Sequence, residues 1–474
     1  MEAERPNPSQ LRDALPPERA SLQGYVLDDV YPSNFHPEFT PNWIDAMLRA
    51  RNVAPPRSPG NAFAMMDLGC GDGLGLIIVA AAHPEGRFVG VDALPAHVER
   101  GTSVASSCGV TNVSFRCAFF SDVENPPEPA FDYVTAQGVM SWVGADNQQH
   151  VRRIAASHLR PGGILCVGYN CQPGWKDALA FQQMVRMLAD EETGDAIARF
   201  DAAVERIRAM GAAGAAAFSG PFMEWLDGLR GRLPASYFPH EYLNRYWTPH
   251  WSAEMIEAMA AHGFGFAAPG RADRLRDDFS LKAAQRTEIA RMANSLARET
   301  AKDIFMRTTF RVDLYDREAS RVPAPADARL DSWWAAASSE DQAEYACKTA
   351  AGTLTFDNDA ARAIMAGLQA GPTTLRSIHT GGQAGDEADL LDGADALFVA
   401  GWIVPAGPAS TAPAAAAVNA HVGREAAAIG ALAGRHGPMP LSTRTIERAR
   451  SDQAECSDDE RAEARAILTR LGIM

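Results

Sequence analysis

The chain has 474 residues, a length that predicts about three domains at roughly 150 residues per domain. Its 44 Lys and Arg residues against 59 Asp and Glu residues give a formal net charge of −15. This charge argues against a nucleic-acid partner, because phosphate backbones require clustered Lys and Arg. No apolar run approaches the ~18 residues of a membrane span, so we expect no membrane partner either.

The first residues and the cysteines indicate a cytoplasmic protein. Residues 1–24 are polar and proline-rich without an apolar core, so we expect a disordered lead-in rather than a signal peptide. The 7 cysteines are odd in number and scattered along the chain, unlike a disulfide framework. We therefore expect reduced thiols and a cytoplasmic location.

Short apolar strands alternate with helices in the first part of the chain. We expect strands over residues 63–68, 87–91, 113–116, 131–135 and 164–169. We expect helices between them over residues 74–83, 95–108 and 146–159. This alternation is typical of a doubly wound parallel sheet, and it predicts an α/β core domain over residues 25–176.

The pattern then changes to helices, which predicts a helical insertion over residues 177–235. A helix over 252–262 and strands over 264–267 and 310–315 follow. We expect residues 236–320 to complete the sheet.

The last part of the chain is expected to form smaller units. After a linker, we expect a helix over 333–350, an extended segment over 352–357 and a helix over 359–370. These elements suggest a small α+β, winged-helix-like domain over residues 329–404. An Ala- and Pro-rich spacer over 405–417 precedes a C-terminal helical module, which we expect over 418–474.

A glycine-rich turn follows the first expected strand, and an acid ends the second. The turn is Gly69-Cys-Gly-Asp-Gly73, whose glycines allow a tight turn, close approach of a ligand and open amides at a helix start. Asp92 ends the next strand, where a doubly wound fold places an acid on ribose hydroxyls. Together they predict a nucleoside-binding crevice.

These segments resemble a known family. Met66-Asp-Leu-Gly-Cys-Gly-Asp-Gly73 and Phe88-Val-Gly-Val-Asp92 are similar to motifs of class I S-adenosylmethionine (SAM) dependent methyltransferases. Other segments resemble the subgroup with a methyltransferase regulatory domain, which includes bacterial protein lysine methyltransferases. These segments are Phe131–Trp142, Gly168–Asn170, Pro173–Trp175, His240–Leu243 and Phe310–Arg311. The resemblance implies a Rossmann-like methyltransferase sheet, SAM as the cofactor and transfer of its methyl group by in-line displacement.

The resemblance also implies roles for individual residues. The cofactor-binding set is Asp67, Gly69, Cys70, Gly71, Gly73, Asp92, Ala93, Leu94, Ser121, Asp122, Gln137 and Gly138. The residues expected around the reacting methyl group are Gln137 and the aromatic walls Tyr25, Tyr31, Trp142 and Tyr169. The residues expected to bind the acceptor are His36, Trp142, Asn170 and His240. We expect no metal site, because no His, Asp or Glu cluster has metal-ligand spacing.

Two departures from the subgroup leave the acceptor open. Gln137 stands where the subgroup often has His, and Met140 where it often has Tyr. The first hypothesis is methylation of protein lysines, and the second is N-, S- or O-methylation of a small molecule. The third is a non-catalytic SAM-binding regulator, which the acidic charge and the complete motif set disfavour. The oligomeric state, with a homodimer as one option, is also open.

Overall fold

The computed structural model describes residues 35–440 with gaps at 127–129, 219–220, 319–322, 326, 338–344, 357–358, 382–385 and 426–430. Beyond residue 440 it describes 464–465, 467–469 and 473. The expected lead-in, Tyr25, Tyr31 and most of the expected C-terminal module lie outside the described residues.

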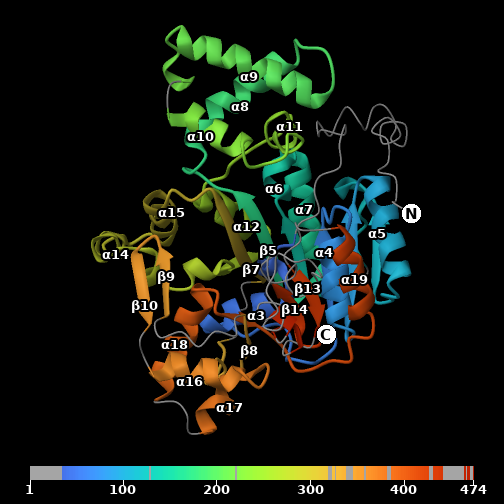
Figure 1. The fold of residues 1–474 in the computed structure, drawn as a ribbon, viewed down its shortest axis with the longest axis vertical. Coiled ribbons are helices and arrows are strands. Elements are labelled where there is room, and N and C mark those ends of the chain that lie inside the picture. Colours follow the sequence, from blue (N-terminus) through green and yellow to red (C-terminus); the bar gives the residue numbers. More distant parts are fainter. Residues whose placement is uncertain are drawn as a thin grey trace, which may run out of the picture.

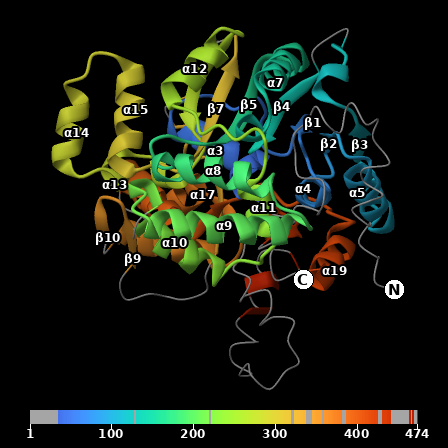
Figure 2. The same cartoon turned by 90° about the horizontal axis from the view of Figure 1, so that it is seen from above.

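A seven-stranded sheet forms the centre of the molecule, in the order β3-β2-β1-β4-β5-β7-β6 (Figures 1 and 2). The strands are β1 (Phe63–Leu68), β2 (Gly86–Asp92), β3 (Val113–Cys117), β4 (Phe131–Gln137), β5 (Leu159–Asn170), β6 (Phe264–Pro269) and β7 (Phe310–Arg317). Strands β1 to β5 pair in parallel, whereas β7 runs antiparallel to β5 and β6. The expected doubly wound α/β sheet is thus confirmed.

Helices cover both faces of the sheet, and a hydrophobic core fills each side. They include α3 (Pro41–Ala50), α4 (Leu74–Ala82), α5 (Pro95–Ser107), α6 (Val139–Trp142), α7 (Ala145–His158) and α12 (Ser252–Ala260). Helix α4 is almost wholly buried, because the sheet covers one side and the C-terminal segment covers the other. Among the described residues, no helix combines the length and the apolar character that crossing a bilayer requires.

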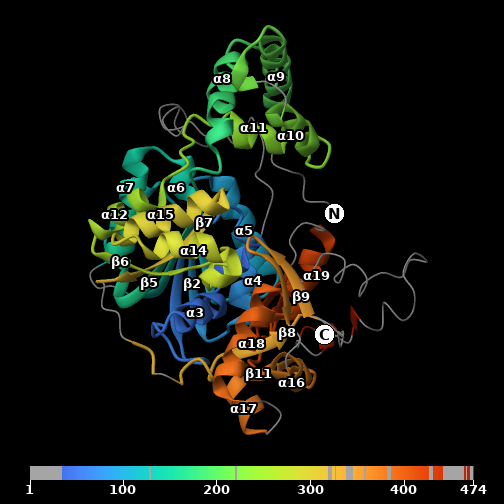
Figure 3. The same ribbon diagram turned by 90° about the vertical axis from the view of Figure 1, so that its left-hand side faces the viewer.

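The helical insertion stands at one end of the molecule (Figure 3). It contains α8 (Leu179–Ala189), α9 (Ala196–Ala212), α10 (Pro221–Arg230) and α11 (Tyr237–Tyr242). Its helices share a separate core, in which Phe181, Phe200 and Phe238 are buried. Because β5 leads directly into the insertion, the insertion lies over the carboxyl ends of the strands.

Three helices that the sequence analysis did not anticipate connect β6 to β7. They are α13 (Asp277–Ser280), α14 (Ala283–Ala290) and α15 (Ser295–Met306) (Figure 2). Asn294 caps α15 through its side-chain oxygen, which accepts hydrogen bonds from the amides of Leu296 and Ala297.

A small α+β unit lies at the other end of the molecule (Figure 1). It has an antiparallel sheet of β8 (Trp333–Ala336), β11 (Thr373–Thr374) and β12 (Ile403–Pro405), with helices α16 (Asp359–Leu368), α17 (Leu375–Thr380) and α18 (Glu387–Val399). A hairpin of β9 (Tyr345–Thr349) and β10 (Gly352–Phe356) precedes α16. The helix expected over 333–350 is wrong, since aromatic residues at its start favour the strand β8.

The spacer expected over 405–417 is also wrong, because this segment is packed. Ala406 and Ala412 are buried, and the Gly407 amide donates to the His436 carbonyl at 2.7 Å. The segment leads into α19 (Ala415–Glu425) and the hairpin of β13 (Ala431–Gly434) and β14 (Gly437–Pro440), which contact α4. An Ala-rich segment can pack closely because its side chains are small.

Candidate active site

Two adjoining cavities lie at the carboxyl ends of β1, β2 and β4, where the strand order reverses. Open α/β sheets bind ligands at such a switch point. The smaller cavity has a volume of about 150 Å³ and the larger one about 410 Å³. Gly69, Gly71, His97 and Gln137 line both, so the two cavities form one crevice.

The glycine turn forms the floor where the two cavities meet. Its geometry requires glycine at residue 69, where φ is +75° and an added Cβ would lie 2.5 Å from Cγ2 of Val139. Gly71 also has a positive φ, but an added Cβ there would meet no atom within 4 Å. The backbone at Gly71 is therefore open to a ligand. Gly73 lines neither cavity and instead packs against Phe115.

Asp92 is fixed in the wall of the larger cavity by the backbone. Its Oδ2 accepts from the Gly71 amide at 2.9 Å, and its Oδ1 accepts from the Leu94 amide at 2.9 Å. Ala93 and Leu94 line the same cavity beside it. The carboxylate thus joins the glycine turn to the end of β2.

His97, which the sequence analysis missed, lies 3.2 Å through Nδ1 from Oδ1 of Asp92. Burial would lower the pKa of His97, but the hydrogen bond and charge of Asp92 raise it above its ordinary value. The sequence offered a sign of this contact, because Pro95 starts helix α5 and thus places His97 in its first turn, close after the strand-ending Asp92.

Asp67 and Cys70 line the smaller cavity. Oγ1 of Thr135 donates to Oδ1 of Asp67 at 2.7 Å, while burial raises the pKa of Asp67 to about 6. Burial and the neighbouring acids raise the pKa of the Cys70 thiol well above its ordinary value, so the thiol stays protonated. His36 lines the same cavity, and burial lowers its pKa.

The larger cavity has an aromatic and acidic wall. Gln137 and Gly138 lead from β4 into α6, which brings Trp142 to the wall. The other aromatic lining residues are Phe119, Phe120, Trp175, Tyr237 and Phe310. Its acidic and histidine lining residues are Asp92, His97, His240 and Glu241, and no described Lys or Arg lines it. This wall is suited to a ligand of positive charge.

Asn170 and His240, which the resemblance gave as acceptor-binding residues, line the larger cavity as well. Asn170 is 7 % exposed, and its Nδ2 has no hydrogen-bond partner within the described part of the chain. Its backbone is fixed, since its amide donates to Oγ of Ser141 at 2.8 Å and its carbonyl accepts from the His250 amide at 2.8 Å. A buried amide nitrogen of this kind is suited to a bound ligand.

Several expected site residues lie elsewhere. Tyr169 is fully buried and lines neither cavity, because its hydroxyl donates to Oδ2 of Asp313 at 2.6 Å. Ser121 and Asp122 are exposed and line neither cavity. The two residues before them, Phe119 and Phe120, line the larger cavity instead. Met140, which departs from the subgroup, is buried away from the cavities. Among the described residues, no group of three His, Cys, Asp or Glu side chains could hold a metal ion.

Two family models match the chain. Residues 60–204 match one described as a methyltransferase domain, and residues 234–317 match one described as a predicted methyltransferase regulatory domain. Both matches agree with the resemblance drawn from the motifs and confirm it. The second match contains β6, α13 to α15 and β7.

Curated relatives and solved structures are similar to this chain. An uncharacterised protein of Synechocystis sp. is 25 % identical over 62 % of this chain and 58 % of its own length. An uncharacterised protein of Rickettsia prowazekii is 28 % identical over 32 % of this chain and 61 % of its own. The matches thus span less than two thirds of these relatives. A solved structure, that of PKMT2 from Rickettsia typhi in complex with AdoHcy, is similar to this chain with a TM-score of 0.66 and 16 % identity. The match covers 93 % of this chain and 97 % of the PKMT2 chain, and it confirms the fold.

Proposed function

We propose that this chain, a SAM-dependent methyltransferase with a methyltransferase regulatory domain, transfers a methyl group to lysine side chains of another protein. The observation that carries the proposal is the wall of the larger cavity, which combines aromatic side chains with Glu241 and no described Lys or Arg. Such a wall attracts an ammonium group and accommodates its methylated product through cation–π contact. The resemblance of the motifs to bacterial protein lysine methyltransferases supports the same acceptor.

The crevice fits SAM, since Gly71 has open space beside it and the backbone holds Asp92 at the wall. When bound, SAM supplies a methyl group on a sulfonium for in-line displacement. The smaller cavity, with Asp67 and Cys70, would take the methionine part. Asp92 would accept from the ribose hydroxyls, and Leu94 with Phe119 would enclose the adenine.

Gln137 lines both cavities, so it would face the reacting methyl group from the end of β4. The acceptor would enter between Trp142 and Asn170, where alignment and exclusion of water serve the displacement. A lysine must first lose a proton, because its ordinary pKa is near 10.4. The aromatic wall favours the neutral amine by desolvation, and His240 is placed to accept the proton.

Labelled SAM tests the proposal when the full chain is incubated with a cell extract and the products are separated into proteins and small molecules. We expect label in protein, with methylated lysine in the digested bands by mass spectrometry. Label in small molecules alone would instead indicate the small-molecule enzyme, and label in neither fraction would contradict methyl transfer. Glu241→Gln, compared with Glu257→Gln on the outer helix α12, should weaken acceptor binding selectively.

A further inference from the structure

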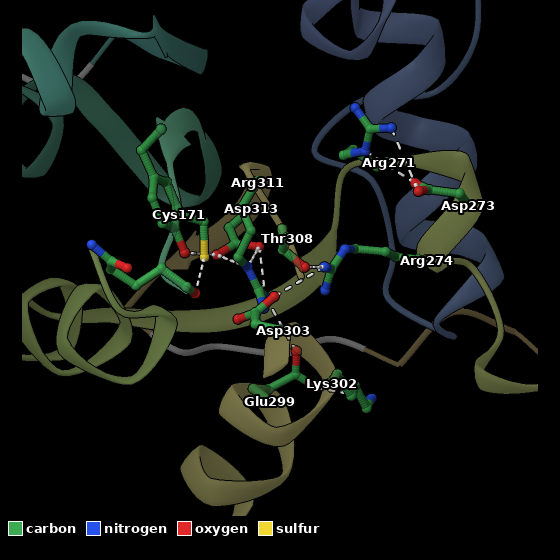
Figure 4. Close-up of polar contacts among 12 residues, drawn as sticks. Cys171, Arg271, Asp273, Arg274, Glu299, Lys302, Asp303, Thr308, Arg311 and Asp313 are labelled. Atoms are coloured by element: carbon green, nitrogen blue, oxygen red, sulfur yellow. Dashed lines mark hydrogen bonds and ion pairs between the residues drawn. The ribbon is translucent and has the colours of Figure 1, made fainter. Parts of the chain in front are cut away.

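A buried cluster of charges lies in the part of the chain matched by the regulatory-domain model (Figure 4). We define the Arg311 cluster as Arg274, Glu299, Asp303, Arg311 and Asp313. Arg311, Asp303 and Asp313 have side chains that are fully buried. Buried charges are costly unless each is paired, and each charge of this cluster has a partner of opposite sign.

The ion pairs of the cluster join helix α15 to strand β7. Nη1 of Arg311 lies 2.9 Å from Oδ2 of Asp303, and Nη2 lies 2.9 Å from Oδ1 of Asp313 and 3.1 Å from Oε2 of Glu299. Nη2 of Arg274 lies 2.9 Å from Oδ1 of Asp303. Arg311 thus meets three carboxylates that come from two elements.

The cluster also fixes the turn between α15 and β7. The Thr308 amide donates to the Asp303 carbonyl at 3.1 Å, and Arg274 donates to the Thr308 hydroxyl. Arg307 has a φ of +47°, which ends the helix sharply. Asp303 and Arg274 both bind Thr308 and therefore hold the chain where it enters β7.

This turn holds the loop that follows β5. The Thr309 carbonyl accepts from the Cys171 amide at 2.8 Å and from Nε1 of Trp175 at 2.7 Å. The Thr308 carbonyl accepts from the Gly174 amide at 3.0 Å. An added Cβ on Gly174 would lie 2.3 Å from that carbonyl oxygen, so only glycine allows this close approach.

The loop after β5 and the adjoining ends of β5 and β7 carry three residues of the larger cavity's lining, Trp175, Asn170 and Phe310, which we call the acceptor wall. Trp175 lies on the loop, while Asn170 and Phe310 are paired at the ends of β5 and β7. One step along the same strand pair, Tyr169 lies opposite Arg311, and its hydroxyl donates to Asp313. Three wall residues are thus held, through short backbone contacts, by the Arg311 cluster.

We propose that Arg311 is a positioning residue for the acceptor, and that the domain called regulatory holds the acceptor wall in place. The proposal rests on the proposed function, because it assumes that the acceptor binds in the larger cavity. Arg311 touches neither cavity, so it acts through Trp175, Asn170 and Phe310. Asp67 on β1 bonds to Thr135, and Asp92 on β2 bonds to the amides of Gly71 and Leu94, so we expect this side of the crevice to be unaffected.

The test compares Arg311→Lys with Arg57→Lys in the full chain. Lysine keeps the charge but lacks the fork that meets several carboxylates at once. Arg57 is a matched control, since its side chain is 3 % exposed, its Nε lies 3.3 Å from Oδ2 of Asp45, and it lines neither cavity. For Arg311→Lys we expect kcat/KM for the acceptor to fall by about 100-fold, as displacements near 1 Å can cause, with the Kd for AdoHcy within about twofold. An equal loss of AdoHcy affinity, or the same loss of kcat/KM in the control, would overturn the proposal.

Glu299→Gln provides a second variant if Arg311→Lys does not fold, because Glu299 lies at the edge of the cluster with 16 % of its side chain exposed. Amide hydrogen exchange at Cys171 and Gly174 should then be faster than in the wild type, while Gly71 should exchange unchanged. Unchanged exchange at both loop amides would refute the proposal. The exchange measurement needs no acceptor, so it tests this inference separately from the proposed function. An absence of methyl transfer by the wild type would contradict the proposed function, and the exchange rates would still decide whether the cluster positions the loop.

Discussion

The two sides of the crevice are built in different ways. The cofactor side comes from short contiguous segments, the turn 69–73 and the strand end 92–94, which backbone amides hold together. The side that we propose for the acceptor comes from segments far apart in the chain: the end of α6 at Trp142, the end of β5 with its loop, helix α11 and the start of β7. The cofactor side depends on local conformation, whereas the opposite side depends on tertiary packing. Single substitutions should therefore affect cofactor binding and acceptor binding separately.

Among these variants, we expect Asp92→Ala to have the largest effect, through the loss of affinity for AdoHcy. The change removes the carboxylate that we expect to accept from two ribose hydroxyls, and such bonds to a charged group contribute about 1.5–3 kcal/mol. We expect the Kd for AdoHcy to rise by about 100-fold in calorimetry. Asp122→Ala is the matched control, since Asp122 is an exposed acid outside both linings. AdoHcy binding as tight as in the wild type would show that the ribose lies elsewhere.

Trp142→Ala should affect the acceptor side alone. The indole lines the larger cavity from α6, and a cation–π contact contributes about 0.5–2 kcal/mol. We expect KM for a lysine acceptor to rise by about tenfold, Trp142→Phe to recover most of the loss, and calorimetry to give an unchanged Kd for AdoHcy. A parallel rise in that Kd would mean that Trp142 contacts the cofactor.

Gln137→Ala sharpens the comparison, because Gln137 lines both cavities. If its amide orients the reacting groups, kcat should fall by about fivefold, the effect of one neutral hydrogen bond. The Kd for AdoHcy should change little under the same conditions. Equal losses in kcat and AdoHcy affinity would place this residue on the cofactor side.

The smallest effect is a pH dependence of stability at His97. Because Asp92 raises the pKa of His97 above 6.5 in the folded chain, protonation stabilises the fold below that pH, and the contribution is lost as the pH rises through the folded value. We expect the protein to be more stable at pH 6 than at pH 8, measured as the free energy of urea unfolding. In His97→Gln the difference in unfolding free energy between pH 6 and pH 8 should be smaller than in the wild type by the contribution of His97. An unchanged difference would mean that another group is responsible for the pH dependence.

The same contrast explains what could be predicted from the sequence. Asp67, Gly69, Gly71 and Asp92, which line the crevice, could be singled out from the sequence because strand–turn–helix patterns are local. Tyr169 was misplaced because a strand buried on both faces gives no sign of which side chains reach an edge.

Other residues were missed although their neighbourhoods were noticed. Trp175 and Glu241 lie within segments that carried the family resemblance, yet only the folded chain brings them to one wall. The charges of α15 gave no signal, since a helix rich in Glu, Lys and Asp usually indicates a solvated surface. Their burial depends on Arg311 from a strand that follows later in the chain.

Helix α4 shows how the ends of the molecule depend on each other. Its first turns, at Gly75, Leu76 and Val79, line the smaller cavity, while β13, β14 and α19 cover its outer side. A chain cut before residue 406 would expose this apolar helix to water, and large exposed apolar patches favour aggregation. We therefore expect the methyltransferase domain to aggregate when it is cut from these segments, one of which binds the end of α4 through Ser410, 328 positions further along the chain.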